Sequence, residues 1–305
     1  MNEFFDYHRA LLADELRTRG YREAIRNVVK PGDVVLDLGA GSGVLSFFAC
    51  DAGASRVYAI DQTHMADVIR FLARHLRLDD RVTVFHAESA EAELPERANV
   101  LVTETMGVSG FDEGILGHVL DARARLLRPN ARIIPRALSL CVAPVEITED
   151  YDSLIAWWST RRYGLDLAQL RVFASNAMHL VHIEESAHLD DGVNAIDVEL
   201  ATFDSTVVRG SASFLASRRA TLHGFATWFD ATLIEDVSIS NRGTRATHWS
   251  QGFLPLEKPI AVDRGTRIEV EIETDDGKSW QWSGSAGGTR FEQSTWFSMP
   301  PCNAI

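Results

Sequence analysis

The spacing of apolar and polar residues divides the chain into two parts. In the first part, four short apolar runs at residues 34–40, 56–61, 82–87 and 98–104 are separated by helical stretches such as 43–53 and 64–78. Continuous apolar strands that alternate with helices are typical of a parallel sheet buried on both faces. The pattern therefore predicts a Rossmann-like α/β domain over residues 1–135.

After Pro135 the pattern changes. Residues 196–203, 232–240 and 267–274 alternate apolar and polar side chains, as half-buried antiparallel strands do. The segments 278–285 and 294–299 add aromatic residues, which favour strands. We expect an antiparallel β-barrel or sandwich over residues 136–305, with no flexible linker between the two parts.

Charge and hydropathy limit the classes of partner. The chain has 43 acidic and 30 basic residues, a net charge of -13, which disfavours nucleic acid and favours a cationic substrate. No apolar run is long enough to span a bilayer. Residues 1–25 lack the basic start and apolar stretch of a signal peptide, so we expect a cytoplasmic protein with no membrane partner.

The cysteines and histidines do not indicate a metal or a disulfide framework. The three cysteines are widely spaced, and no C-x-x-C motif is present. The closest group of histidines, at 179, 182 and 188, lacks the paired spacing of ligands held on one element. A polar surface segment is the favoured explanation, and no metal site is predicted.

A glycine-rich turn, D-L-G-A-G-S-G at 37–43, follows the first strand and begins a helix. Gly39 and Gly41 allow a tight turn and the close approach of a ligand. Asp61 ends the next strand, where a carboxylate can accept both ribose hydroxyls of a nucleoside. The third glycine of a dinucleotide-binding turn is replaced by Val44, so the turn, with Asp37 before it, favours S-adenosylmethionine over a nicotinamide dinucleotide.

Two glutamates lie on the segment that follows the fourth strand, T-E-T-M-G-V-S-G-F-D-E at 103–113. Glu104 falls at the same edge of the sheet as the glycine turn, and Gly107 and Gly110 permit a reversal that brings Glu113 back beside it. Two close carboxylates repel each other unless a cation lies between them. A guanidinium group fits because it is planar, always charged and able to bond both carboxylates in a forked geometry. A solvated acidic turn is the alternative for this loop taken alone.

Together these motifs resemble the protein arginine methyltransferase family. V-L-D-L-G-A-G-S-G resembles its first cofactor motif, and T-E-T-M-G with the later Glu113 resembles its double-glutamate loop. T-H-W-S-Q at 247–251 resembles its threonine–histidine–tryptophan loop. The segments 11–22 and 157–167 are similar to its cofactor-covering helix and to the start of its dimerisation arm. The matches occur in family order over nearly the whole chain.

The resemblance implies a role for each matched residue. It implies that Glu104 and Glu113 hold the guanidinium, while Asp14 pairs with His248 and closes the site. It implies that the cofactor S-adenosylmethionine is bound by Arg17, Asp37, Gly39, Gly41, Asp61 and Ser89, and the substrate by Tyr7, Met106 and Trp249. It also implies a homodimer in which a helical arm in the region of residues 150–190 docks on the partner subunit.

The chain departs from the family pattern near the substrate. Thr105 and Val108 replace a tryptophan and a tyrosine, Leu11 and Ile115 replace methionines, and Ala90 replaces the glutamate that contacts adenine. These departures suggest a bacterial or biosynthetic member, so a protein arginine and a free guanidine both stay open as substrates, as does the number of methyl groups.

Two other functions also fit the fold. The same fold methylates other small-molecule nucleophiles, but a doubly anionic clamp suits a cation. A regulatory partner that binds S-adenosylmethionine without catalysis is disfavoured because both glutamates, Arg17 and His248 are retained.

Overall fold

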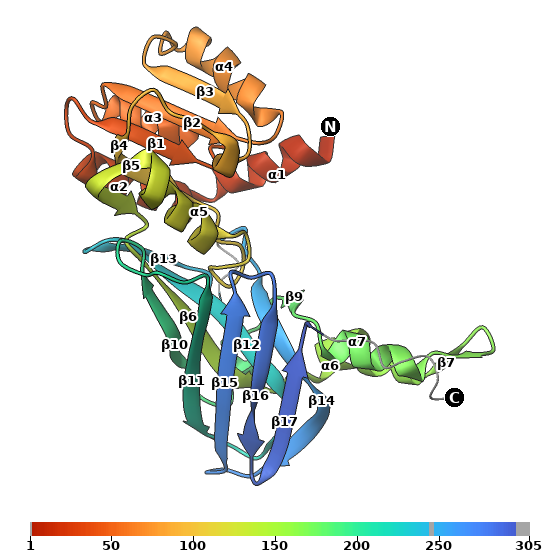
Figure 1. The fold of residues 1–305 in the computed structure, drawn as a ribbon. Helices are drawn as coiled ribbons and strands as arrows, with labels where there is room; N and C mark the ends of the chain where they lie inside the picture. Colours follow the sequence, from red (N-terminus) through yellow and green to blue (C-terminus); the bar gives the residue numbers. More distant parts are fainter. Residues whose placement is uncertain (1, 244–246, 297–305) are drawn as a thin grey trace.

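The computed structural model describes residues 2–243 and 247–296 of the 305-residue chain. Its first half is a five-stranded parallel sheet with helices packed around it (Figure 1). The elements, in chain order, are α1 (Asn2–Ala13), α2 (Glu15–Val28), β1 (Val34–Leu38), α3 (Val44–Asp51), β2 (Arg56–Asp61), α4 (Met65–His75), β3 (Val82–His86), a 3-10 turn at Ser89–Glu91, β4 (Ala98–Thr103), α5 (Ile115–Asp121), which continues as a π-helical turn to Leu126, and β5 (Leu127–Ile134).

The strand order β3-β2-β1-β4-β5 determines where a ligand can bind. After β1, the strands β2 and β3 are added on one side of it, and β4 and β5 are added on the other side. The direction of strand addition therefore reverses between β1 and β4. In open parallel sheets, ligands bind beyond the carboxyl ends of the strands at this switch point. Gly39 follows β1 and Glu104 follows β4, so both fall at that point. All five residues of β1 are buried, as expected for a strand covered on both faces.

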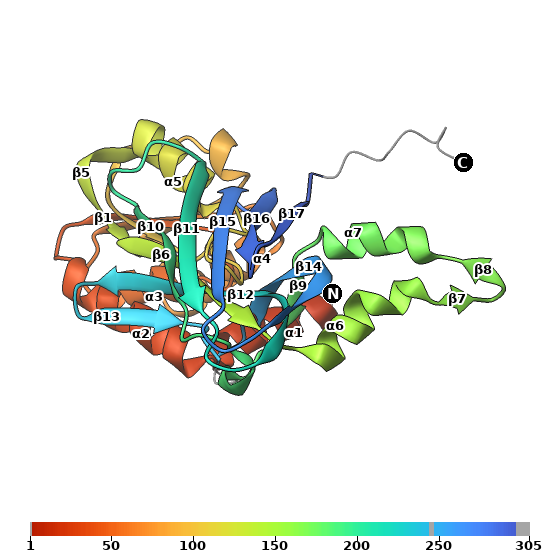
Figure 2. The same ribbon diagram turned by 90° about the horizontal axis from the view of Figure 1, so that it is seen from below.

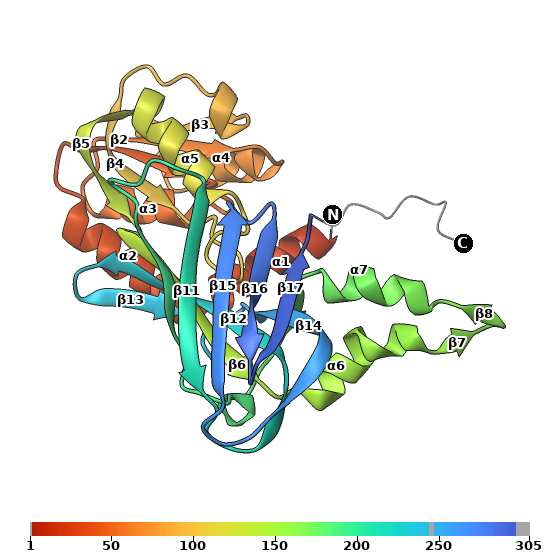
Figure 3. The ribbon, with the colours of Figure 1, turned by 60° about the horizontal axis from the view of Figure 1, so that its bottom comes forward.

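The second half is built from two antiparallel sheets that enclose an apolar core (Figure 3). One has the order β10-β6-β12-β14-β9, with β13 also paired to β12, and the other has the order β11-β15-β16-β17. Their bounds are β6 (Ala137–Val145), β9 (His179–Val181), β10 (Val193–Glu199), β11 (Val207–Leu215), β12 (Ala220–Ile234), β13 (Val237–Ser240), β14 (Gln251–Val262), β15 (Arg267–Asp275), β16 (Trp280–Ala286) and β17 (Thr289–Ser294). Phe225, Leu254 and Trp282 are among the large side chains buried between them.

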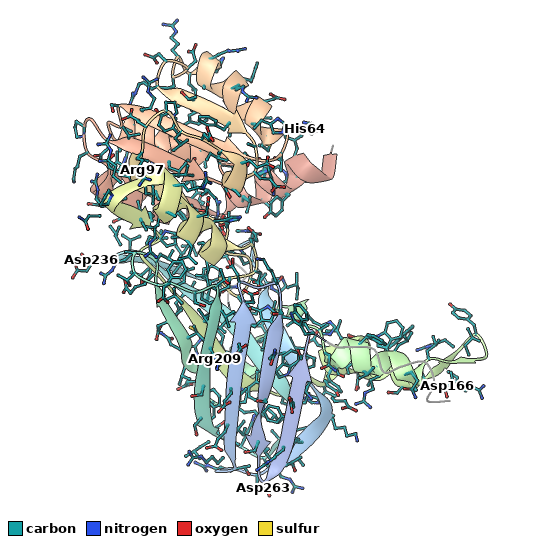
Figure 4. The ribbon with its side chains drawn as sticks, in the orientation of Figure 1. His64, Arg97, Asp166, Arg209, Asp236 and Asp263 are labelled. Carbon is teal, nitrogen blue, oxygen red and sulfur yellow. The ribbon has the colours of Figure 1, made fainter. Side chains whose placement is uncertain are left out.

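A helical hairpin projects from this β-domain (Figure 2). It consists of α6 (Thr148–Leu154), a 3-10 turn at Ala156–Ser159, the short strands β7 (Arg161–Arg162) and β8 (Leu165–Asp166), a second 3-10 turn at Ala168–Leu170, and α7 (Arg171–Ser175). Tyr163 and Gly164 both have positive φ, as a two-residue hairpin turn requires. Figure 4 labels Asp166 near the end of the hairpin. A further 3-10 turn, at Glu185–Ala187, follows β9.

The architecture confirms the predicted fold class, a Rossmann-like domain followed by an antiparallel β-domain with a helical arm. The segment 232–240, however, is not one strand as predicted. The chain reverses at Glu235 and Asp236, so β12 and β13 pair as a hairpin. The predicted strand at 196–203 ends earlier, at Glu199. Residues 297–299 of the predicted strand at 294–299 lie outside the described residues.

The two halves are packed closely together. The β12–β13 hairpin, near the labelled Asp236 in Figure 4, lies against α2, where a Cβ on Gly20 would be 3.0 Å from Ile239. On the other side, the Asp276 carboxylate of the β15–β16 turn accepts hydrogen bonds from the backbone N–H groups of Leu116 (2.9 Å) and Gly117 (2.8 Å) at the start of α5. The β-domain therefore holds both helices that flank the switch point. In the described part of the chain, no helix has the length and apolarity to cross a membrane.

Candidate active site

A cavity of about 530 Å³ opens at the carboxyl ends of β1, β2 and β4. Four residues predicted from the sequence to act at the site, Gly39, Asp61, Ser89 and Glu113, line it. The cavity lies at the switch point of the sheet, where the topology alone predicts a ligand.

The glycine turn forms one wall of this cavity. Gly39 and Gly41 have φ values of 72° and 51°, a region that side chains other than glycine rarely adopt. A Cβ on Gly39 would lie 2.7 Å from Cγ2 of Thr105, and a Cβ on Gly41 would lie 3.1 Å from the ring of His8. The turn is therefore restricted to glycine both by its backbone angles and by its close neighbours.

The two aspartates near the turn have different positions. Asp61 is at the cavity wall, where one carboxylate oxygen accepts the N–H of Gly41 (2.7 Å) and the other accepts the N–H (2.8 Å) and hydroxyl (2.5 Å) of Thr63. These bonds fix the carboxylate, and Oδ2, which accepts only one of them, keeps capacity for a further donor. Asp37 does not line the cavity; it is buried and accepts the hydroxyl of Ser46 at 2.6 Å. Burial raises the pKa of Asp37 to about 6. Asp37 thus bonds the first turn of α3, and its contact with the cofactor stays a prediction.

These features fit S-adenosylmethionine. A nucleoside needs a carboxylate at the ribose position, which Asp61 supplies, and a turn without side chains for close approach, which Gly39 and Gly41 supply. Ser89 and the neighbouring Ala90 line the same cavity.

Arg17 makes a buried ion pair with Glu104. Its Nε donates to Oε2 of Glu104 at 2.6 Å, and its Nη2 also contacts that oxygen. The two side chains are 7% and 6% exposed. The sequence prediction assigned Arg17 to the carboxylate of the cofactor, whereas in this structure its guanidinium bonds the first glutamate. Glu104 therefore already binds one guanidinium through Oε2.

Asp14 joins the N-terminal helices to the β-domain. It is the N-cap of α2, and its Oδ1 accepts the N–H of Arg17 at 2.9 Å. Its Oδ2 accepts the backbone N–H of His248 at 3.0 Å and lies 2.9 Å from that residue's Nδ1. Burial alone would raise the pKa of Asp14, but the hydrogen bonds from His248 and Arg17 lower it below its usual value. Since an ionised carboxylate only accepts, Nδ1 carries the proton, and in the neutral ring Nε2 is then the acceptor.

The loop between the glutamates is held in a compact reversal. Gly107 and Gly110 have positive φ, and the N–H of Asp112 donates to the carbonyl of Met106 at 3.0 Å. The half-buried carboxylate of Asp112 accepts the N–H of Ser109 at 2.6 Å and its hydroxyl at 2.9 Å. This reversal places Glu113, nine residues after Glu104, at the wall of the cavity.

Burial and the negative charge of Glu104 both raise the pKa of Glu113. Surrounding protein atoms desolvate its carboxyl group, and the charges of Glu104 and Asp112 add to this effect, so the pKa of Glu113 rises to about 7. Its side chain nevertheless remains accessible to solvent, because it faces the open cavity. A carboxyl group with these properties is ready to take up either a proton or a bound cation.

The residues predicted to bind substrate lie at different depths. Tyr7 is half exposed on α1, and burial together with the charges of Glu113 and Glu104 raises its pKa to about 12. Met106 is fully buried, and Trp249 is 5% exposed, with its ring edge-to-face on Phe229 at 4.9 Å. Both side chains are therefore buried in this structure, and their predicted contact with a substrate stays a prediction.

Several residues of the site were not predicted from the sequence. His118 of α5 lines the cavity, and its Nδ1 lies 3.5 Å from the hydroxyl of Thr105. Burial lowers the pKa of His118, which favours the neutral ring. Asp276 and Asn241 hold the site from the β-domain. No local motif marks these residues, because each acts through contacts with distant segments.

The geometry defines a Rossmann-like methyltransferase site with two acidic groups beside a nucleoside pocket. Residues 136–285 match the family model described as the arginine methyltransferase oligomerization subdomain, and residues 17–105 match that of the ribosomal protein L11 methyltransferase PrmA. Protein arginine N-methyltransferase 6 of Xenopus laevis is 31% identical over 280 residues, covering 87% of this chain and 82% of that protein. A probable protein arginine N-methyltransferase 6 of Arabidopsis thaliana is 32% identical, covering 85% of this chain and 62% of that protein.

Solved structures show the same fold. The Trypanosoma brucei PRMT1 enzyme–prozyme heterotetrameric complex with AdoHcy has a TM-score of 0.83 and 23% identity, covering 94% of this chain and 96% of that chain. Arabidopsis thaliana protein arginine methyltransferase 10 has a TM-score of 0.77 and 22% identity, covering 94% and 96%. The chain belongs to the protein arginine N-methyltransferase family. The sequence-based predictions of the family and of S-adenosylmethionine as its cofactor are thereby confirmed.

Proposed function

We propose that this protein methylates a guanidinium nitrogen of arginine residues in polypeptides. The observation that carries the proposal is the pair of glutamates at the switch point. Glu104 already binds a guanidinium, that of Arg17, while Glu113 faces the cofactor cavity and its pKa is raised partly by the charge of Glu104. A cation placed between the two carboxylates removes their repulsion, so the site is complementary to a second guanidinium.

The side chains then have distinct tasks. Both contacts of Arg17 go to Oε2 of Glu104, which holds that carboxylate in one orientation. Glu113 accepts N–H groups of the substrate and, once ionised, attracts positive charge away from the attacking nitrogen. Bound S-adenosylmethionine supplies an electrophilic methyl group on its sulfonium sulfur. Most of the rate gain in such a transfer comes from positioning and from preorganised charge.

The substrate nitrogen must lose a proton when the new nitrogen–carbon bond forms. We assign this proton to His248, because Asp14 holds its Nδ1 in the protonated form and leaves Nε2 able to accept. The hydrogen bond from the histidine also connects the β-domain to the N-cap of α2. The same pair therefore closes the site and supplies its base.

Mass spectrometry after incubation with S-adenosylmethionine tests the proposal. Free L-arginine and an arginine–glycine-rich peptide are offered in parallel, and we expect methyl groups on the peptide, with their number giving the product type. Methylation of free arginine alone would instead identify a biosynthetic enzyme. If the protein binds the cofactor tightly but methylates neither substrate, arginine methylation is refuted.

We further propose that two copies form a homodimer through the helical arm. The arm exposes large apolar side chains that a monomer would leave in water; Trp157 is 40% exposed, Leu165 61% and Tyr163 101%. Closed two-fold pairing is the commonest arrangement for such chains. Replacement of residues 156–174 by a short glycine–serine linker should convert a dimer to a monomer in gel filtration with light scattering. A variant that stays dimeric would show that the arm packs within its own subunit.

A further inference from the structure

Hydrogen bonds between distant segments form a ring of contacts around the proposed site. Arg17 bonds Glu104, and Asp14, three residues before Arg17 on the same helix end, bonds His248. Two residues after His248 is Ser250. The ring still needs one connection, from this segment back to the loop that carries the glutamates.

Asn241 makes that connection. It follows β13 and is fully buried. Its Nδ2 donates to the carbonyl of Val108, near the middle of the glutamate loop, at 2.8 Å, and to the carbonyl of Ser250 at 2.6 Å. Its Oδ1 accepts the backbone N–H of Phe229 of β12 at 2.8 Å. One side chain thus joins three segments that are far apart in the sequence.

The chemistry of an amide side chain explains why asparagine suits this position. The carbonyl groups of Val108 and Ser250 need donors, and the N–H of Phe229 needs an acceptor, all in a water-poor environment. A primary amide offers two donors and an acceptor within a few ångströms. Aspartate has the same shape but no donor when ionised, so it would place negative charge against two carbonyl oxygens.

The other contacts of the loop with the β-domain are weaker or less directional. The hydroxyl of Ser109 lies 3.5 Å from Sδ of Met178, and the backbone of Gly277 packs closely against that of Asp112. The internal hydrogen bonds of the loop join Ser109, Asp112 and Met106 and fix its shape. Gly110 lies against Phe229, where a Cβ would be 2.9 Å away, so the contact there is made by backbone. The amide of Asn241 therefore supplies a directional bond between the loop and the strand that carries Phe229.

We propose that Asn241 is a positioning residue for methyl transfer: by tying the glutamate loop to the segment that carries His248, it sets the separation of Glu104, Glu113 and the base. This inference rests on the proposed function. Among the described residues, Asn241 is not one of those that line the cavity at the switch point, and its side chain bonds none of them, so it acts on catalysis through the position of Glu113 and not through cofactor binding.

The test compares Asn241→Asp with a matched control, Asn99→Asp. Asn99 lies at the opposite end of β4 from Glu104, where its Oδ1 accepts the N–H of Val34 at 2.7 Å and its Nδ2 donates to Asp33 at 2.6 Å. Both substitutions replace a bonded amide by a carboxylate, but only the first reaches the glutamate loop. If either aspartate variant fails to fold, the corresponding alanine variants replace the pair.

We expect kcat on the peptide to fall about tenfold in Asn241→Asp, while the Kd for S-adenosylhomocysteine stays within about twofold. Asn99→Asp should retain kcat per folded molecule. Hydrogen–deuterium exchange of residues 104–114 should rise in the first variant only, since the loop then opens more often. The exchange measurement needs no turnover.

Exchange of residues 104–114 at the wild-type rate in Asn241→Asp would overturn the inference, as would an equal loss of kcat in both variants. A wild-type protein that methylates no arginine would refute the proposed function. Faster loop exchange confined to Asn241→Asp would then still support the anchoring role.

Discussion

Substitution of Glu113 by glutamine should lower activity and raise stability together. The pKa of Glu113 is about 7 in the folded protein against an ordinary value of 4.5. The folded state therefore binds this proton more tightly than the unfolded chain does, and stability is lost as pH rises from about 4.5 to 7. The full shift corresponds to at most about 3 kcal/mol at pH 8. Because Glu113 is exposed to solvent in the cavity, screening by water reduces this free energy. We expect the ionised Glu113 to destabilise the fold by ~1 kcal/mol.

Glutamine is isosteric and uncharged, so Glu113→Gln should unfold at a temperature roughly 2 °C above wild type at pH 8, with no gain at pH 4.5. Its kcat should fall at least about 100-fold, because one anionic wall around the guanidinium is lost. Calorimetry at the two pH values measures the stability, and Glu23→Gln on the exposed face of α2 is the control. A variant that is less stable than wild type at pH 8, or equally changed at both pH values, would refute the assigned cause of the raised pKa.

The remaining predictions concern the cofactor and the first glutamate. Asp61→Ala should weaken S-adenosylhomocysteine binding at least about tenfold in calorimetric titration, because a carboxylate acceptor for the ribose is lost; unchanged affinity would remove Asp61 from the site. Arg17→Lys should lower kcat about tenfold, since an ammonium group cannot hold Glu104 in the forked geometry of a guanidinium, and an unaltered kcat would show that Arg17 does not orient that carboxylate.

The parts of this protein that were predictable from its sequence depend on local patterns. The parallel strands follow from continuous apolar runs, and the glycine turn follows from residues adjacent in the chain. The hairpin at 232–240 was missed because Glu235 and Asp236 fit an alternating strand as well as a turn; only the pairing of β12 with β13 decides between them. The burial of Trp249 could not be predicted from its neighbours in the sequence, since it depends on packing against Phe229.

Contacts between distant segments were the hardest to predict. The pairing of Asp14 with His248, 234 residues apart, was expected from the family resemblance alone, and the structure brings the two together. The ion pair of Arg17 with Glu104 was not expected, because Arg17 was assigned to the cofactor. Asn241 and Asp276 carry no recognisable motif, and their roles appear only when the β-domain is packed on the parallel sheet.

Asp276 caps α5 from the other half of the chain, and this limits which chimeras between relatives can fold correctly. Near the start of the helix that follows Glu113, the backbone N–H groups of Leu116 and Gly117 donate to the carboxylate of Asp276, about 160 residues later in the sequence. A chimera that joins this nucleoside-binding half to a β-domain from another relative would keep every motif of the cofactor pocket yet leave α5 without its cap unless the new turn also brings an acid. A chimera should therefore transfer the first half together with the β15–β16 turn. A junction near Arg136 alone would separate α5 from the carboxylate that caps it.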